Sequence, residues 1–391
     1  MAKLIDITGK ALSGEWGSDD ESGSGIPVLR TTNFTNEGVV NYNNVVTRII
    51  TKKSIEEKYL RPGDIIIEKS GGSDKQPVGR VIYYDGPENT YLFNNFTGLL
   101  RVKNKSRWHP RYVFYSLYSN YRKGGTREYE NKTTGLHNLK TDAYVSRYEV
   151  ADATYIQQKQ ICEHLDIIAG VIRLRQQELQ KLDELIKARF VEMFGDLKLN
   201  PYGWELRSFE DMSELITDGE HATPRRVSKG IYLLSARNVL NHSLQLNDVD
   251  YIDQEEYDRI AKRIIPREGD VLISCSGTVG RCCSVPCGLK FQMVRSAALI
   301  RFKDCLNPVF AEYMITSDFL QDQINSSKTA SSQANLFQGK IAKLKGFVPP
   351  IELQIQFVDF VKQVDKSKAQ VQKALDETQL LFDSLMQEYF G

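Results

Sequence analysis

The feature that most constrains this chain is an internal duplication, because two stretches of different sequence must build the same structure. Gly63–Gly72 matches Gly269–Thr278, and each is a short apolar run that ends in a Ser-Gly turn. The motif Val-Gly-Arg follows in both copies, at residues 78–80 and 279–281. Similar segments that return in the same order indicate two equivalent structural units.

A long helical segment closes each copy, at residues 156–193 and 352–389, and the two align at a constant offset of 196. Apolar residues recur in both at alternating steps of four and three, which is the period of a coiled coil. Because both apolar stripes are narrow and have charged flanks, their simplest burial is against each other. The alternative is that each helix packs on its own globular domain. Arg175 and Lys368 interrupt the stripes and are predicted to set the register. The predicted helix–helix interface consists of Ile161, Leu165, Ile168, Ile172, Leu179, Leu182, Ile186, Phe357, Val361, Val364, Val371, Leu375, Phe382 and Leu385.

The repeat divides the chain into a first globular domain (1–150), a first long helix (151–195), a second globular domain (196–350) and a second long helix (351–391). Short strands bounded by Gly, Pro and Ser turns are predicted at 64–68, 80–84, 91–102, 270–274, 281–285 and 291–302, and helices at 110–122 and 308–324. The expected fold class is therefore an α/β (α+β) two-domain repeat with a pair of long helices between the domains.

The composition is that of an ordinary globular protein. With 391 residues, of which 41% are hydrophobic, the chain can bury two full cores. No apolar run is long enough to span a membrane, and the first residues lack the basic and apolar segments of a secretory signal. We expect a soluble cytoplasmic protein whose cysteines are reduced and form no disulfides.

Motifs of known catalytic and cofactor-binding sites are missing from the sequence. There is no Gly-x4-Gly-Lys-Ser/Thr phosphate loop, no Gly-x-Gly-x-x-Gly fingerprint after a strand and no His-Glu-x-x-His pair. The cysteines between positions 275 and 287 suggest zinc, but they form no paired Cys-x2-Cys motifs. The first copy has Val81 and Ile82 where the second has Cys282 and Cys283, which favours small apolar core residues over metal ligands. We expect no catalytic residue, metal or cofactor in this chain.

Polar and basic loops are the best candidates for contacts to nucleic acid. The net charge is only +1, but residues 1–150 carry 22 basic and 17 acidic side chains. Reading a base requires hydrogen-bonding side chains, and binding a phosphate requires cations, hydroxyls and backbone N–H groups. Four cations at 101, 103, 105 and 107 share one face if that segment is extended, which suits a phosphate track. The candidate DNA-binding residues are Ser70, Ser73, Lys75, Arg80, Arg101, Lys103, Lys105, Arg127, Thr133, Thr134, Asn138, Arg237, Asn238, Ser276, Thr278, Arg281, Arg295, Lys328, Ser331, Gln333 and Asn335. The alternative is that each of them is an ordinary solvated surface residue.

The ordered set of motifs resembles the specificity subunits of type I restriction-modification systems over the whole chain. The resemblance rests on the Gly-Asp-apolar-Ser-Gly segment of both halves, on Phe194-Gly195-Asp196, on Asn200–Trp204 and on Pro349–Gln354 at the start of the second helix. In the first half, Ala153–Ile156 stands where the family usually has prolines before the helix.

This resemblance implies an architecture and a set of partners. The globular domains are then target-recognition domains, and the two helices pair as an antiparallel coiled coil that holds them apart. Each domain reads one half of a bipartite, asymmetric duplex DNA target. The helices dock DNA-adenine methyltransferase subunits that use S-adenosylmethionine, and motor-nuclease subunits join for cleavage, while this chain is not catalytic. The alternatives are a non-catalytic coiled-coil adaptor that presents two protein-binding domains, and an enzyme with an unrecognised site.

Overall fold

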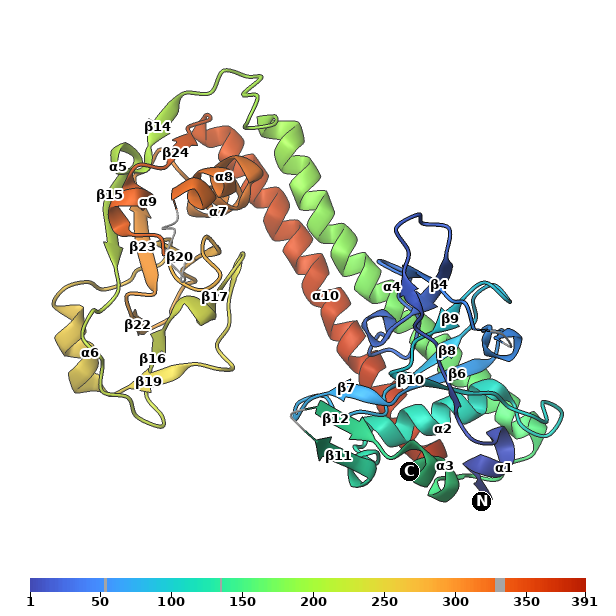
Figure 1. Cartoon of the computed structure of the whole chain (residues 1–391). Coiled ribbons are helices and arrows are strands. Elements are labelled where there is room, and N and C mark those ends of the chain that lie inside the picture. Colours follow the sequence, from blue (N-terminus) through green and yellow to red (C-terminus); the bar gives the residue numbers. More distant parts are fainter. Residues whose placement is uncertain (53–54, 134–135, 328–334) are drawn as a thin grey trace. The chain divides into compact units, whose positions relative to one another are not determined.

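The structure is a computed structural model of the chain (Figure 1). It describes residues 1–52, 55–133, 136–327 and 335–391. Among these residues, no helix is long and apolar enough to cross a membrane.

The chain folds into two compact units. Unit 1 comprises Met1–Gln176 together with Lys373–Gly391, and unit 2 comprises Gln177–Gln372. The long helices α4 (Tyr155–Phe194) and α10 (Ile351–Phe390) therefore each contribute one part to each unit. These helices confirm the two long helical segments predicted from the apolar period.

The centre of unit 1 is an antiparallel sheet with strand order β2-β10-β6-β8. In its strand β6 (Asp64–Glu68), Ile65 and Ile67 belong to the core formed with helix α2 (Pro110–Arg122), whereas Ile66 belongs to the core on the other face. Successive residues of a strand point to opposite faces, so an uninterrupted apolar run is buried on both sides. The other strands of this sheet are β2 (Leu12–Ser13), β8 (Val81–Tyr84) and β10 (Thr97–Leu100).

Two further sheets and several short elements complete unit 1. The sheet β3-β5-β4-β9 joins Ser18–Asp19, Val46–Ile49, Ile26–Leu29 and Leu92–Phe93, with β4 and β9 parallel. The sheet β11-β12-β7 joins Glu130–Thr133, Leu136–Leu139 and Ser70–Gly72. The remaining elements are β1 (Ala2–Lys3), which pairs with β13 (Glu149–Val150), α1 (Leu4–Thr8), α3 (Thr141–Arg147) and the 3-10 turns η1 (Thr31–Asn33), η2 (Glu56–Lys58) and η3 (Arg127–Tyr129).

Unit 2 repeats this plan. Its central antiparallel sheet β15-β23-β20-β21 joins Ser213–Asp218, Ala297–Phe302, Val271–Ser274 and Cys282–Ser284. Its second sheet β19-β16-β22 joins Asp250–Ile252, Ile231–Leu234 and Phe291–Met293, again with one parallel pair, β16 and β22. The remaining elements are β14 (Leu206–Ser208), β17 (Val239–Leu240), β18 (Ser243–Leu244), β24 (Lys345–Phe347), α5 (Phe209–Met212), α6 (Gln254–Ala261), α7 (Pro308–Thr316), α8 (Asp318–Ser327), α9 (Gln338–Ala342) and η4 (Ala236–Asn238).

Most predicted strands are confirmed, but three predicted elements are each two elements. The run 91–102 divides into β9 and β10 because the chain turns at Asn94, whose backbone oxygen accepts the Thr97 N–H at 3.1 Å. The run 291–302 divides into β22 and β23 at a similar turn. The helix predicted at 308–324 ends at Thr316, because Ser317 adopts an extended backbone (ψ 154°), and a new helix begins at Asp318.

In unit 1 the two long helices lie against each other. The Arg175 guanidinium donates hydrogen bonds to the Ala374 carbonyl and the Thr378 hydroxyl. Nearer the start of α4, His164 contacts the Tyr389 hydroxyl at 3.4 Å. Since residues rise along one helix while they fall along the other, the helices are antiparallel here. Both also pack on the globular part, where Phe382 joins the same apolar core as α2.

Unit 2 shows the same arrangement with different residues. Lys368 forms an ion pair with Asp183 at 2.6 Å, and the Phe190 and Phe357 rings lie 5.4 Å apart. The Phe194 ring packs on the ring of Phe310 in α7, with 4.7 Å between the ring centroids. All residues predicted for the helix–helix interface are buried or partly buried. In both units residues of these stripes also belong to the apolar core of the globular part, so the two packing alternatives do not exclude each other.

A buried glutamine anchors the start of each long helix to its domain. The side-chain oxygen of Gln158 accepts the His109 N–H at 2.8 Å, and that of Gln354 accepts the Asn307 N–H at 2.8 Å. In both copies the side-chain amide N–H groups donate to two backbone carbonyls. Neither side chain is exposed. The two copies therefore share this joint as well as their sheets.

Candidate nucleic-acid interface

A buried Asp–Arg pair forms part of the frame of each globular domain. Arg101 donates to both Asp64 oxygens at 2.7 and 2.6 Å, and Arg301 donates to both Asp270 oxygens at 2.7 Å. Arg101 also donates to the carbonyls of residues 57 and 59, so four of its hydrogen bonds are made within the protein. A guanidinium has five N–H donors. The structure thus uses Arg101, a predicted DNA contact, to hold the end of β10 to the start of the neighbouring strand β6.

The predicted extended track from 101 to 107 is wrong as a structure. Strand β10 ends at Leu100, and the Asn104 side-chain oxygen then accepts the N–H groups of residues 106 and 107, which closes a turn. Lys103 and Lys105 are exposed. Arg107 is instead paired with Asp152. An Asn that caps its own following backbone favours a turn over a strand, so these cations do not share one strand face.

The loop after β6 gathers several predicted residues of unit 1. Ser70 opens β7 and donates from its hydroxyl to the Asn138 side-chain oxygen on β12, although the two residues are 68 positions apart. Ser73 and Lys75 are exposed in the same loop. Arg127 is exposed and donates to the Asp74 carbonyl at 3.3 Å. Hydroxyl, amide and cationic groups from two distant segments therefore share one surface.

Unit 2 brings its predicted residues together by the same pairing. Ser276 forms a β-bridge with Asn335, as Ser70 does with Asn138. The neighbouring hydrogen bond is also repeated. The Leu139 N–H donates to the Lys69 carbonyl at 2.8 Å in unit 1, and the Leu336 N–H donates to the Cys275 carbonyl at 2.9 Å in unit 2. The exposed candidates of this unit include Thr278, Arg237 and Arg295.

Arg80 and Arg281 both anchor a turn of their own domain. Arg80 donates to the Thr31 and Phe34 carbonyls at 2.8 and 3.1 Å, and Arg281 donates to the Ala236 carbonyl at 2.9 Å. Both side chains are partly buried. Because the two copies repeat this contact, it belongs to the shared frame, and the exposed loop residues around it are the better candidates for contacts to DNA.

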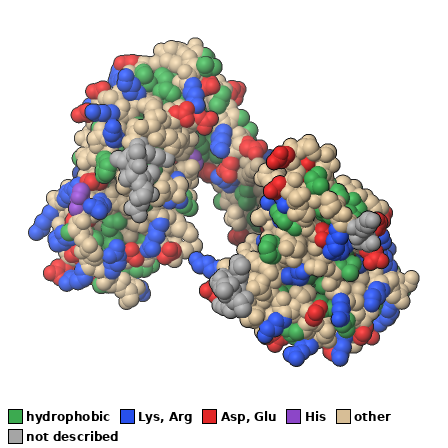
Figure 2. Space-filling view, in the orientation of Figure 1, with side chains coloured by type: hydrophobic (Ala, Val, Ile, Leu, Met, Phe, Trp, Pro, Cys, Tyr) green, Lys and Arg blue, Asp and Glu red, His purple; other side chains and the backbone are tan. Residues whose placement is uncertain are grey.

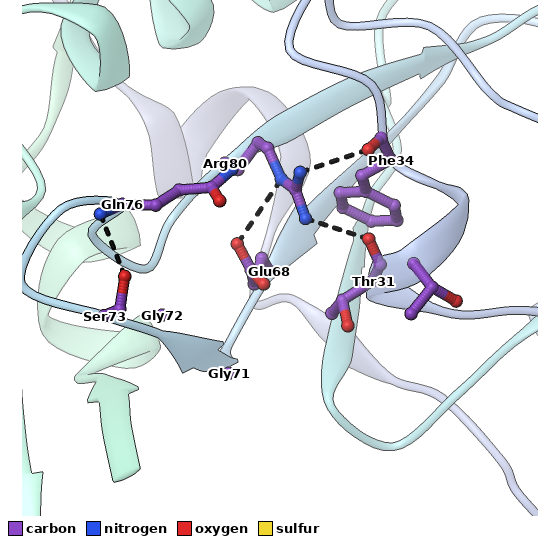
Figure 3. A pocket seen from close by; sticks show the side chains of 9 residues that line it. Thr31, Phe34, Glu68, Gly71, Gly72, Ser73, Gln76 and Arg80 are labelled. Atoms are coloured by element: carbon purple, nitrogen blue, oxygen red, sulfur yellow. Dashed lines mark hydrogen bonds and ion pairs between the residues drawn. The ribbon is translucent and has the colours of Figure 1, made fainter. Parts of the chain in front are cut away.

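A polar cavity of about 220 Å³ lies beside Arg80 in unit 1 (Figure 3). Its wall includes Thr31 and Phe34 on one side and Gly71, Ser73 and other loop residues on the other. Glu68 lies at its inner wall, 3.6 Å from the Arg80 guanidinium, and its side chain is 5% exposed. Burial raises the pKa of Glu68 to about 7, and the nearby Arg80 charge only partly opposes that rise. Glu68 was not among the predicted residues.

Two buried asparagines cap the turns that Arg80 and Arg281 hold. Asn238, a predicted DNA contact, has no exposed surface, and its side-chain N–H groups donate to the carbonyls of residues 245 and 248 at 2.9 Å. Asn33 makes the equivalent contacts in unit 1 at 2.9 and 3.2 Å. The repeated spacing Leu29-x-x-x-Asn33 and Leu234-x-x-x-Asn238 is the sequence signal that identifies this pair. Asn238 therefore serves the fold of its loop.

Several predicted residues lie outside the described part of the structure. Thr134, Lys328, Ser331 and Gln333 belong to this group, and so does the side chain of Thr133. Their role as DNA contacts stays a prediction.

Charge is mixed on the surface of each unit. On the face shown in Figure 2, Lys and Arg side chains alternate with Asp and Glu. Phosphate binding alone depends on accumulated cations, so a mixed surface of this kind gives a modest non-specific attraction to DNA.

The cysteines that the comparison of the two copies assigned to the core are core residues. Cys282 and Cys283 are buried on β21, and Cys162 is buried on α4. Burial raises the pKa of Cys162 and Cys283 to about 12, so these thiols stay protonated. Within the described ranges, His, Cys, Asp and Glu side chains form no group that could hold a metal ion.

Comparison with known proteins finds a family model that matches the second copy of the repeat. Residues 201–378 match the family model of the type I restriction modification DNA specificity domain. The second globular domain is a type I restriction-modification DNA specificity domain. This match confirms the resemblance expected from the sequence, and no curated protein sequence matches the chain.

Solved structures share the fold of this chain over its whole length. The S subunit of the type I restriction-modification system from M. genitalium matches 100% of this chain and 95% of its own, with a TM-score of 0.57 and 12% identity. A structure from work on complex assembly and conformational transition of the type I R-M system matches 100% of this chain and 96% of its own, with a TM-score of 0.54 and 15% identity. At identities this low, the structural match shows that these chains share a mixed α/β fold.

The family match also bears on function. A specificity domain of this family recognises DNA and is not itself catalytic, which agrees with the missing catalytic motifs. Residues 201–378 are accordingly similar to the specificity domain of type I restriction-modification systems, as the sequence resemblance predicted.

Proposed function

We propose that each globular domain reads one half of a bipartite, asymmetric duplex DNA target. This proposal rests on the observation that the two domains share one framework of sheets and turns but differ in the loop that follows the Ser-Gly turn. Both copies have the Asp–Arg pair and the arginine-anchored turn, yet the segment between the Ser-Gly turn and the following arginine runs from Ser70 to Arg80 in one copy and only from Ser276 to Arg281 in the other. Loops on a rigid scaffold carry recognition, so unlike loops select unlike half-sites.

The long helices serve in this proposal as an antiparallel coiled coil between the two readers. Arg175 with Thr378 in unit 1 and Asp183 with Lys368 in unit 2 support that pairing. A spacer of this kind suits DNA, because adjacent major-groove segments on one side of the duplex lie roughly 34–36 Å apart.

We propose further that the helices dock DNA-adenine methyltransferase subunits, which carry S-adenosylmethionine and the methylation chemistry, and that a motor-nuclease subunit completes the complex. Ile167, Val171 and Leu174 of α4 follow one another at i, i+4 and i+7, outside the predicted seam. Ile167 and Leu174 are 66% and 63% exposed. A stripe of exposed apolar side chains favours burial against another protein.

The reading function is tested by selection from a random duplex library with this chain and its methyltransferase partner. The expected result is a gapped, two-part sequence whose halves differ. Transfer of the short loop 276–281 in place of 70–80 is expected to change one half of that sequence only. If the wild-type complex shows no sequence preference, the adaptor alternative is correct and this proposal is wrong.

The docking function is tested with single substitutions on α4. Ile167→Glu or Leu174→Glu is expected to abolish co-purification of the methyltransferase subunit, because a charge then replaces a buried apolar contact. Gln176→Glu is the control, since this exposed residue lies on another face of the same helix. Undiminished co-purification of both variants contradicts docking at this stripe.

A further inference from the structure

The cavity of unit 1 is lined by a carboxyl that receives no hydrogen bond from the described residues. The Glu68 side chain is only 5% exposed, yet no described residue donates a hydrogen bond to its carboxyl oxygens. The carboxyl lies at the cavity wall next to Gly71, and a Cβ built on Gly71 would lie 3.4 Å from its Oε1 atom. A carboxyl with so little exposure and no donor from the protein takes its hydrogen bond from whatever enters the cavity, either water or a ligand.

Arg80 does not meet this need, although it is close. Its terminal N–H groups donate to the Thr31 and Phe34 carbonyls, and its Nε atom is 3.6 Å from the Glu68 carboxyl. A separation of that length is too long for a hydrogen bond. Figure 3 marks both carbonyl contacts and the Arg80–Glu68 ion pair with dashed lines. The guanidinium is held in place by the frame and supplies only a nearby positive charge.

The second copy shows that the frame does not require a carboxyl at this position. Ser274 occupies the place of Glu68 in the repeat. Its hydroxyl donates to the Thr278 carbonyl at 2.7 Å and accepts the Arg281 N–H at 2.9 Å, so its hydrogen bonds are made within the loop. The turn therefore has the same fold in both domains. Ser274 makes its hydrogen bonds within the loop, whereas the Glu68 carboxyl receives none from the described residues.

The size and charge of the cavity restrict what enters it. A volume of about 220 Å³ is below the roughly 300–1,000 Å³ of sites for cofactors and drug-sized ligands, so it takes part of a larger ligand. The adjacent Arg80 charge disfavours a metal cation. A neutral N–H group donates to the carboxyl and adds no positive charge next to Arg80. It therefore suits both the carboxyl and the charge beside it.

We propose that Glu68 determines specificity in the first domain by accepting a hydrogen bond from the exocyclic amino group of a base, cytosine N4 or adenine N6. The inference rests on the proposed function, since it places that group on the DNA half-site read by this domain. Exposed Lys75 and Arg127 near the mouth are suited to the flanking phosphates. An N–H donor from the base favours the ionised form of Glu68, and in that form the carboxylate accepts and does not donate, so it discriminates against bases that present a carbonyl at the same place.

The test compares wild type, Glu68→Gln and the exposed control Glu88→Gln, each as the full chain in complex with its methyltransferase partner. Binding is measured to duplexes that carry every single base change in both half-sites. A glutamine both accepts and donates, so Glu68→Gln is expected to reduce discrimination at one base-pair position by roughly 5- to 100-fold. The other half-site and the control variant are expected to keep their preferences.

The outcomes separate this inference from the proposed function. If the wild type selects a two-part sequence but Glu68→Gln selects it equally well at every position, Glu68 does not read a base. An equal loss at all positions also overturns the inference, because it indicates a structural role. Absence of any preference in the wild type overturns the proposed function itself.

Discussion

The stability cost of Glu68 is open to direct measurement. Burial raises the pKa of this carboxyl from 4.5 to about 7. The folded protein thus holds the proton more tightly than the unfolded chain, and its stability falls as the pH rises from 4.5 through 7. At about 1.4 kcal/mol for each tenfold change in the ionisation constant, the loss approaches about 3 kcal/mol above pH 8. Glu68→Gln removes the ionisation, so we expect the variant to gain about 3 kcal/mol over wild type at pH 8.5 and almost nothing near pH 4.5.

The assay is urea unfolding of the full chain between pH 4.5 and 8.5, followed by tryptophan fluorescence. The chain has three tryptophans, and a Trp204→Phe background leaves Trp16 and Trp108, which both lie in unit 1. Glu88→Gln is the control, because the Glu88 side chain is 58% exposed. A stability difference for Glu68→Gln that does not change with pH would refute the reasoning, as would a variant less stable than wild type at pH 8.5.

Three more predictions concern the shared frame. Asp64→Asn and Asp270→Asn each leave a partly buried arginine without its carboxylate and are expected to cost about 3–5 kcal/mol, which urea unfolding checks; a cost below about 1 kcal/mol contradicts the role given to these pairs. Gln158→Ala and Gln354→Ala each remove three hydrogen bonds at the start of a long helix. At about 0.5–1.5 kcal/mol per bond, the free energy of unfolding of each variant is expected to fall by about 2–4 kcal/mol. Amide hydrogen exchange at the start of the affected helix is expected to be faster, and unchanged exchange would contradict the anchoring role of the glutamine. Arg175→Leu replaces the polar seam contact with an apolar one and is expected to raise the melting temperature by a few degrees while loosening the register, measured by cysteine cross-linking across the seam; a lower melting temperature argues against a purely register-setting role.

Much of the fold was predictable because it depends on neighbours along the chain. The steps of four and three over residues 156–193 and 352–389 reflect helix geometry, and α4 and α10 follow them closely. The apolar runs at β6 and β20 are buried on both faces, as strands of that composition usually are. Comparison of the two copies also assigned Cys282 to the core, because a valine replaces it in the first copy.

The candidate site was harder to predict, because polar residues look alike in a sequence. Ser70 and Asn138 were chosen by residue type, and the structure brings them together. Arg101 was chosen on the same grounds, but the structure uses most of its hydrogen bonds on Asp64 and nearby carbonyls. Composition gives the number of cations and hydroxyls in a loop, and it says nothing about which of them already have partners.

The sequence alone determined the duplication, the two long helices and the resemblance to the specificity family. Those properties arise from periodicity and from the order of short motifs, which depend on residues close together in the chain. The tertiary structure decided which members of the repeat are free to act. Glu68 and Ser274 hold equivalent positions, and the folded chain leaves the first at a cavity wall without a protein donor while it closes the second within its turn. Burial, charge and hydrogen-bond partners come from segments far apart in sequence, and so they emerge only when the chain has folded.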